Sequence, residues 1–285
     1  MPDSLSDAAP ALKGNVKHSV VFWCFNAGGD RWDLAQTCRA ARRLGIASVE
    51  VVGPEGWPTL REHGLTCALA PNGTPAEPFK YGFNNAALHP ELLARTTGSI
   101  DACAAAGVPA VISFFGYRWR DTNDPASGEI PRDEAFANCV KGLKDLARVA
   151  ERKGVTVCVE HLNTRDDTHP MKGHPGYQGD DLDWCAEVIR KVGSPRVKLL
   201  FDVYHVQIMH GDLIRRIESV KELIGHVHTA GVPGRGELDE NQEVHYPAVM
   251  RKLAQIGFTG YVGHEFIPTR DPAVGLREAV RVCDV

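Results

Sequence analysis

No stretch of this 285-residue chain holds the roughly 18 consecutive apolar residues that a membrane-spanning helix requires. Its first residues, MPDSLSDAAP, lack the basic start and the apolar centre of a secretory signal. Positive charge is not in excess, because 32 Lys and Arg stand against 36 Asp and Glu. A general nucleic-acid binder needs a basic face that neutralises phosphates. We therefore expect a cytoplasmic protein with neither a membrane nor a nucleic-acid partner, although a local basic pocket for a small acid stays open.

Paired cysteines are also missing. The eight cysteines form no CxxC pair and show no zinc-finger spacing. Most lie in apolar segments, where a free thiol packs as a small hydrophobic group. We expect them to be reduced, as is usual in a cytosolic protein.

Strand-like and helix-like segments alternate along the rest of the chain. The predicted strands cover residues 18–23, 47–52, 65–70, 109–115, 155–160, 197–201, 226–229 and 261–265. The predicted helices cover residues 32–44, 57–63, 90–106, 133–153, 181–192, 208–223, 246–256 and 271–283. Eight β-then-α units are the number that closes a (β/α)8 TIM barrel, and the length fits a single domain. An open doubly wound sheet is less favoured, because residues 26–30 (NAGGD) lack the GxGxxG pattern at the first turn.

The predicted domain organisation is simple. Residues 1–16 are polar and are expected to form a flexible or loosely docked N-terminal tail. Residues 17–285 are expected to form the barrel.

Four successive predicted strands end on ionisable residues. Glu160 closes VTVCVE, Asp202 follows KLLF, His228 closes GHVH and Glu265 closes GYVGHE. An ionised carboxylate avoids apolar surroundings unless a metal or a partner meets it. In a barrel these strand ends converge on the C-terminal rim, where active sites lie.

This combination of side chains predicts a metal site. Three carboxylates and one imidazole, without a thiolate, suit Mn²⁺, Mg²⁺ or Co²⁺ better than a structural zinc ion. We predict one divalent ion, with Mn²⁺ the first choice, and no organic cofactor. The alternative is a network of rim carboxylates neutralised by Arg165, Arg235 and Lys198.

Four motifs carry a resemblance to a known family. They are VEHLNTR (159–165), FDVYHVQIMHGD (201–212), GHVHTAGVPGRGELD (225–239) and GHEFIP (263–268). They resemble the xylose-isomerase-like barrels, and above all the hydroxypyruvate isomerase group, over residues 12–284. Ketose 3-epimerases and inosose dehydratases are related groups. The resemblance implies a divalent ion bound by the residues at positions 160, 202, 228 and 265. At position 228 the family frequently has Gln. The histidine of this chain is closer to the epimerase pattern.

These groups permit enolisation of an α-hydroxycarbonyl compound. A divalent ion acidifies the C–H between adjacent oxygens, and a carboxylate removes the proton to form an enediolate. Returning the proton to the neighbouring carbon isomerises the compound, whereas returning it to the opposite face of the same carbon epimerises it. We predict Glu160 and Glu265 as opposed acid/base groups.

The resemblance also implies a substrate. It is hydroxypyruvate, converted to 2-hydroxy-3-oxopropanoate (tartronate semialdehyde). The alternatives are a ketose 3-epimerase acting on a free keto-sugar and an inosose-type dehydratase.

Three further residues are candidates for substrate binding. His205 lies three residues after Asp202 and can turn back over the substrate, where the family pattern places a donor to a substrate oxygen. Arg235 lies in the loop PGRG, and the family uses this arginine on the substrate; a carboxylate would suit it. Glu243 resembles a family glutamate that orients Arg235 or caps the next helix.

The surroundings of the predicted site are less sharply defined. His226 is expected to point away from His228 and to be structural, while Glu50 is a weaker candidate at the second strand end. The loop HPMKGH (169–174) is expected to be solvated, with Lys172 within reach of an anionic substrate. Aromatic residues that we expect near the pocket are Trp23, Phe25, Phe114 and Phe115.

Other classes of function remain in view. An abasic-site endonuclease would need more histidines for a multi-zinc cluster and a basic face for DNA. A catalytically silent barrel that binds a sugar or a protein would have little use for paired carboxylate bases. The family includes dimers and tetramers, so the resemblance leaves a homo-oligomer open.

Overall fold

The computed structural model describes residues 11–27, 30–169 and 171–285. Seven strands form one parallel sheet in the order β2-β1-β9-β8-β7-β6-β3. They are β1 (Lys17–Val21), β2 (Ser48–Glu50), β3 (Ala110–Phe114), β6 (Thr156–Glu160), β7 (Val197–Asp202), β8 (Ile224–Thr229) and β9 (Tyr261–His264). Their residues are mostly buried, as expected for parallel strands covered on both faces.

The stretch 65–70 lies between the two ends of this sheet. It forms a parallel bridge to β2 at Ser48–Thr66 and another to β3 at Ala70–Val111. The amide of Val51 donates to Leu69 (2.8 Å), and the amide of Ala70 donates to Ala110 (2.9 Å). The stretch therefore occupies the place of the third predicted strand and closes the ring, so the predicted (β/α)8 barrel is confirmed.

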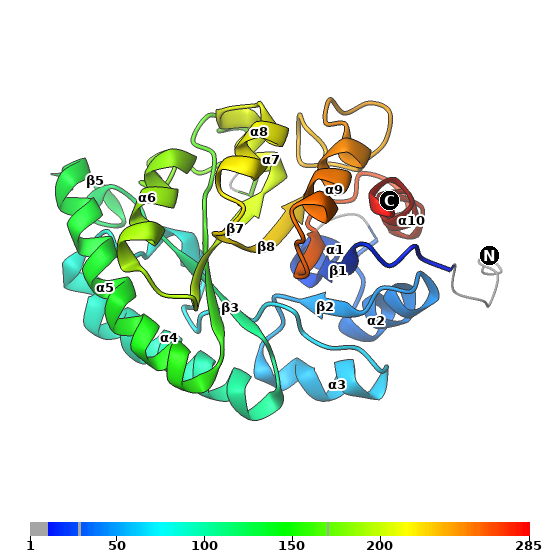
Figure 1. The fold of residues 1–285 in the computed structure, drawn as a ribbon, viewed down its shortest axis with the longest axis horizontal. Helices are drawn as coiled ribbons and strands as arrows, with labels where there is room; N and C mark the ends of the chain where they lie inside the picture. Colours follow the sequence, from blue (N-terminus) through cyan, green and yellow to red (C-terminus); the bar gives the residue numbers. More distant parts are fainter. Residues whose placement is uncertain (1–10, 28–29, 170) are drawn as a thin grey trace.

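Helices surround the sheet (Figure 1). They are α2 (Leu34–Arg43), α3 (Trp57–Glu62), α4 (His89–Ala106), α5 (Arg132–Lys153), α6 (Leu182–Val192), α9 (Tyr246–Gln255) and α10 (Pro272–Cys283), together with the pair α7 (Val203–Met209) and α8 (Leu213–Ser219). Short 3-10 turns occupy η1 (Pro54–Gly56), η2 (Pro78–Lys80) and η3 (Ala86–Leu88). Asp181 caps the start of α6 through the amides of Asp183 and Trp184. Helices α4 and α5 end at Gly107 and Gly154, which adopt the left-handed conformation and form tight turns.

Three segments differ from the prediction. The first strand ends at Val21, and helix α1 (Phe22–Ala27) begins at once. The helix predicted over 208–223 is broken by Gly211 and Asp212, which both have positive φ (64° and 49°). The connection between the predicted strand 109–115 and the predicted helix 133–153 contains an antiparallel hairpin of β4 (Trp119–Asp121) and β5 (Asp124–Glu129). The hairpin strands are largely exposed and polar, so they carry no apolar alternation that sequence could reveal.

The chain ends and the thiols also bear on the predictions. Residues 1–10 of the predicted tail lie outside the described residues. The amide of Lys13 donates to Asp284 Oδ1 (3.0 Å), and Asn15 Nδ2 donates to the carbonyl of Val285 (2.7 Å). All eight cysteines are buried and free, as predicted. Within the described ranges, no helix is long and apolar enough to cross a membrane.

A buried histidine in β1 makes stability depend on pH. His18 is 2% exposed, its Nδ1 lies 3.1 Å from His264 Nε2, and burial lowers its pKa to about 4. The unfolded chain, with a histidine pKa of about 6.5, binds this proton more readily, so the stabilisation is complete above pH 6.5 and is lost as the pH falls toward 4. The slope is about 1.4 kcal/mol per pH unit, hence roughly 2 kcal/mol between pH 7 and 5.

Urea unfolding at a series of pH values measures this loss. The variant His18→Gln should flatten the slope below pH 6.5, whereas His245→Gln, at an exposed position, should not. An unchanged slope in His18→Gln would contradict the assignment.

Candidate active site

The barrel brings the four predicted strand-end residues together. Glu160 and Asp202 are the last residues of β6 and β7, His228 lies in β8, and Glu265 follows β9. Their ligand atoms all lie within 4.8 Å of one another. None of the four residues is more than 5% exposed. The predicted convergence on one rim is thus present in the structure.

Local contacts hold the ends of β6 and β7 in place. The hydroxyl of Tyr177 donates to the carbonyl of Glu160 (2.8 Å) and accepts from the amide of Phe115 (2.8 Å), which ties β6 to the end of β3. Asp202 Oδ1 accepts from the amide of Tyr204 (2.7 Å) at the start of α7. This cap uses one oxygen of Asp202 and leaves Oδ2 directed toward the cluster.

Unpaired polar atoms gather at the centre of the cluster. Within the described residues, Glu160 Oε1, Asp202 Oδ2 and His228 Nδ1 are buried without a hydrogen-bond partner. His228 Nδ1 lies 2.9 Å from Glu265 Oε2 and 3.6 Å from Glu160 Oε1, which is ion-pair distance, but the alignment is not that of a hydrogen bond. Isolated polar atoms are costly to bury. Three carboxylates and an imidazole with such unpaired atoms fit a divalent cation.

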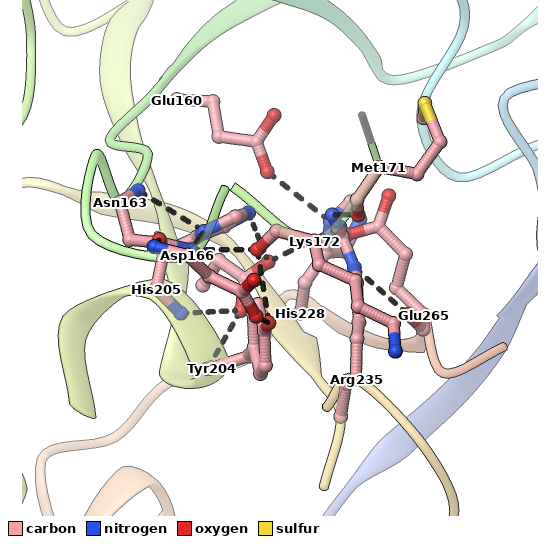
Figure 2. A network of polar contacts seen from close by, with 12 residues as sticks. Glu160, Asn163, Asp166, Met171, Lys172, Tyr204, His205, His228, Arg235 and Glu265 are labelled. Atoms are coloured by element: carbon pink, nitrogen blue, oxygen red, sulfur yellow. Dashed lines mark hydrogen bonds and ion pairs between the residues drawn. The ribbon is translucent and has the colours of Figure 1, made fainter. Parts of the chain in front are cut away.

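Arg235 neutralises one side of the cluster. Its Nη2 donates to Glu265 Oε2 (2.5 Å) and lies 3.7 Å from Asp202 Oδ2. The guanidinium lies over the rings of Trp23 and Tyr204, with 5.4 Å to each centroid. Figure 2 shows Arg235 beside Glu265. Of the three cations in the alternative rim network, only Arg235 pairs with a cluster carboxylate, since Arg165 and Lys198 donate to backbone carbonyls.

The environment separates the pKa values of the carboxylates. Burial raises the pKa of Glu160, and the charge of Glu265 adds to this effect. Burial also raises the pKa of Asp202, to about 7, although Arg235 opposes it. Burial acts in the same direction on Glu265, but Arg235 and His228 outweigh it and leave its pKa well below the ordinary value. Carboxylates whose pKa values are driven apart are typical of acid/base sites.

His205 lies beside Asp202 and is fully buried. Its Nδ1 accepts from the amide of Asn163 (3.1 Å) and faces Asn163 Nδ2 at 2.7 Å. Because both neighbouring groups are donors, the ring proton lies on Nε2, which is 3.5 Å from Asp202 Oδ2. The structure thus places His205 against Asp202, and not on the cavity wall described below.

Glu243 is not brought into the cluster. It is exposed, and its carboxylate accepts a hydrogen bond from Gln207 Nε2 (3.0 Å). Helix α9 begins at Tyr246 without a side-chain cap. Neither predicted contact, with Arg235 or with the start of α9, is present among the described residues.

A cavity of about 260 Å³ opens beside the cluster. Glu160, Glu265 and Arg235 reach its wall, which is otherwise mainly apolar. Trp23 and Phe114 line it as predicted. The other two predicted aromatics, Phe25 and Phe115, are packed in the core and do not line this cavity.

His174 also lines this cavity, against expectation. The loop 169–174 was expected to be solvated, and His169 is indeed exposed. His174, however, is 3% exposed, and its ring lies 4.1 Å from that of Phe79. Its amide donates to the carbonyl of Asn163 (2.8 Å), which folds the loop inward. No sequence pattern signals this burial, because Phe79 comes from a different loop, between α3 and α4.

Lys172 remains outside the cavity lining. Its carbonyl accepts from Asn163 Nδ2 (2.8 Å) and from the hydroxyl of Tyr204 (2.9 Å), as Figure 2 shows. The backbone of Lys172, rather than its ammonium group, is therefore what connects this loop to the site.

The expectation that His226 points away from His228 is wrong. The two residues are two positions apart in β8, so their side chains share one face. The Nε2 atoms of both lie 2.8 Å from Glu50 Oε1. His226 and His228 also hold the pKa of Glu50 at about 2, against the opposing effect of burial. Glu50, only weakly favoured by sequence, is thus in direct contact with the cluster.

Fold and site together define a (β/α)8 barrel with a carboxylate–imidazole cluster at its strand ends. A family model described as xylose isomerase-like TIM barrel matches residues 38–284, and the chain belongs to this family.

Two relatives agree with this assignment, and a solved structure shares the fold. The 2-oxo-tetronate isomerase of Cupriavidus necator is 32% identical over 169 residues, which cover 58% of this chain and 62% of that protein. The hydroxypyruvate isomerase of Escherichia coli is 26% identical over 145 residues, covering 51% and 53%. Both matches span less than two thirds of the relative's length. The crystal structure of AP endonuclease, family 2, from Brucella melitensis has a TM-score of 0.75 at 23% identity, over 92% of this chain and 97% of that one. At this identity the likeness concerns the fold alone.

Proposed function

We propose that this protein is a divalent-metal-dependent isomerase of a small α-hydroxycarbonyl acid, converting hydroxypyruvate to 2-hydroxy-3-oxopropanoate. The observation that carries the proposal is the pair Glu160 and Glu265, which share one cavity wall and have opposite pKa shifts. The names of the relatives, hydroxypyruvate isomerase and 2-oxo-tetronate isomerase, support the same class of reaction and the same class of substrate.

Glu160, Asp202, His228 and Glu265 are the residues that would hold the cation. When bound, a divalent ion supplies positive charge that acidifies the substrate C–H and stabilises negative charge on the substrate oxygens. Mn²⁺ is the first ion to test, with Mg²⁺ and Co²⁺ next.

Glu160 is the better placed first base. Its Oε1 has no hydrogen-bond partner among the described residues, and its raised pKa favours proton capture. It would take a proton from C3 of hydroxypyruvate, leaving an enediolate. A proton is then returned to C2, and the O3 hydroxyl proton moves to O2, which gives the aldehyde without gain or loss of atoms. Glu265 would be the opposed acid/base group.

Arg235 has two roles in this proposal. Its contact with Glu265 keeps that carboxylate ionised and oriented. Its buried charge at the cavity wall favours a substrate that carries a carboxylate. Its Nη1 already donates to the carbonyl of Met171 (2.6 Å). Arg235 would therefore attract the substrate carboxylate by its positive charge more than by two free N–H donors. A cavity of about 260 Å³ with mainly apolar walls also suits a short acid better than a polyhydroxylated sugar.

A ketose 3-epimerase is the second candidate. The imidazole of His228 in the cluster, at a position where the family frequently has Gln, favours it. Two carboxylates on one cavity wall also allow proton removal and return at a single carbon.

A substrate screen separates these reactions. Metal-loaded protein is incubated in D₂O with hydroxypyruvate, 2-oxo-tetronate and a panel of free ketoses, and the products are identified by NMR. We expect aldehyde formation from a 2-oxo acid and less than about one tenth of that rate on ketoses. Epimerisation of a ketose alone would replace the proposal by the second candidate. Loss of water from an inosose would assign a dehydratase, and no turnover of any of these compounds would overturn the proposal.

A further inference from the structure

We propose that Glu50 is a positioning residue for the metal site: by accepting the Nε2–H of His228, it leaves Nδ1 of that ring free to bind the cation. The inference rests on the proposed metal site and adds to it a residue outside the four ligands.

The carboxylate of Glu50 reaches His228 across the barrel. Glu50 ends β2, which is separated from β8 in the sheet by β1 and β9. It is fully buried, and its Oε1 lies 2.8 Å from Nε2 of both His226 and His228. A glutamate so deep in a barrel is costly to bury unless its partners compensate for the charge.

Gly263 in β9 makes room for this contact. A Cβ at position 263 would lie 2.5 Å from Glu50 Oε1 and 2.9 Å from His228 Cδ2. Gly263 does not have a positive φ, so space rather than backbone conformation is what requires glycine here. The absence of a side chain in β9 therefore allows a carboxylate from β2 to contact an imidazole from β8.

The contact determines which nitrogen of His228 carries a proton in the metal-bound state. An ionised carboxylate only accepts hydrogen bonds, so the nitrogen that faces Glu50 is the N–H. A neutral imidazole has a single N–H, so Nδ1 then presents a lone pair. That atom lies at 2.9 Å from Glu265 and 3.6 Å from Glu160, inside the cluster. Hydrogen bonds of this kind to a metal-binding histidine fix its orientation and raise its basicity.

A purely structural role for Glu50 is the competing explanation, since it also pairs with His226. The two explanations differ in what Glu50→Gln changes. The amide keeps the volume but can turn its NH₂ group toward His228, which favours the wrong tautomer. A positioning role then predicts weaker metal binding, whereas a structural role predicts a loss of stability alone.

Titration calorimetry of Mn²⁺ into the metal-free protein makes the comparison. We expect Glu50→Gln to weaken Mn²⁺ binding by about 10–100-fold. His226→Gln is the matched control, because it alters the same buried carboxylate without changing a cluster ligand; its affinity should stay within about threefold of wild type. Equal affinity of Glu50→Gln and wild type overturns the role of Glu50. Absence of Mn²⁺ binding by wild type overturns the proposed metal site itself, and with it this inference.

The tautomer can also be measured in the wild-type protein, which avoids any folding defect of the variant. Nitrogen-15 NMR of protein loaded with a diamagnetic ion, Mg²⁺ or Zn²⁺, should show His228 protonated at Nε2. Protonation at Nδ1 in the loaded protein would overturn the inference whatever the variants do.

Discussion

Replacing Glu160 by glutamine is expected to lower turnover by about 10²–10⁴-fold, the usual contribution of a positioned general base. The amide keeps the size of the side chain and can still offer an oxygen to a cation, but it cannot take a proton. Burial raises the pKa of Glu160, whereas Arg235 and His228 lower that of Glu265, so Glu160 is the more basic of this pair. Its loss should therefore lower kcat more than it changes KM.

Glu265→Gln is expected to lower turnover similarly but for a partly different reason. Its carboxylate accepts from Arg235 Nη2 and from Trp23 Nε1 (3.1 Å), so the variant also leaves the buried guanidinium without its main counter-charge. A buried charge that loses its partner is destabilising by several kcal/mol. We therefore expect a lower unfolding midpoint for Glu265→Gln than for Glu160→Gln.

Steady-state kinetics with the substrate identified in the screen, together with metal analysis of each variant, test both expectations. Metal content distinguishes a lost base from a lost ligand. Glu134→Gln is the control, because Glu134 is a surface carboxylate paired with Arg120 on the outside of the barrel. If both active-site variants keep wild-type turnover, the two-base mechanism is wrong.

The second large effect is expected on removal of divalent ions. Chelation should abolish turnover, and Mn²⁺ should restore it. Chelation should also lower thermal stability, because the carboxylates at positions 160, 202 and 265 would then face one another, with Arg235 and His228 as their counter-charges among the described residues. A ligand present at about 1,000 times its dissociation constant stabilises the folded state by about 4 kcal/mol.

Calorimetric scans with and without Mn²⁺ measure this shift. Asp202→Asn removes one ligand charge from the cluster and should lose most of the shift. The surface variant Glu134→Gln should keep it in full. Full activity of protein that carries no divalent ion would rule out metal dependence.

Much of the scaffold follows from local sequence. Apolar runs such as residues 155–160, each followed by a helix and a glycine turn, identify the repeating unit, since burial on both faces of a parallel sheet demands such runs. Glu160 and Asp202 each end a buried apolar segment. This position identifies them as candidate site residues, because a buried charge needs a partner. The pattern of apolar residues predicts neither the hairpin β4–β5 nor the break in the helix at Gly211.

What the sequence by itself determined is therefore the count of β-then-α units and the four charged strand ends, because both depend on the order of apolar and polar residues along the chain. The tertiary structure alone decided which other side chains meet them. Glu50 contacts His226 and His228 from 176 and 178 residues away, and Gly263 leaves the space for it. Such contacts exist only after the barrel closes, since closure sets which side chains from distant strands share its interior.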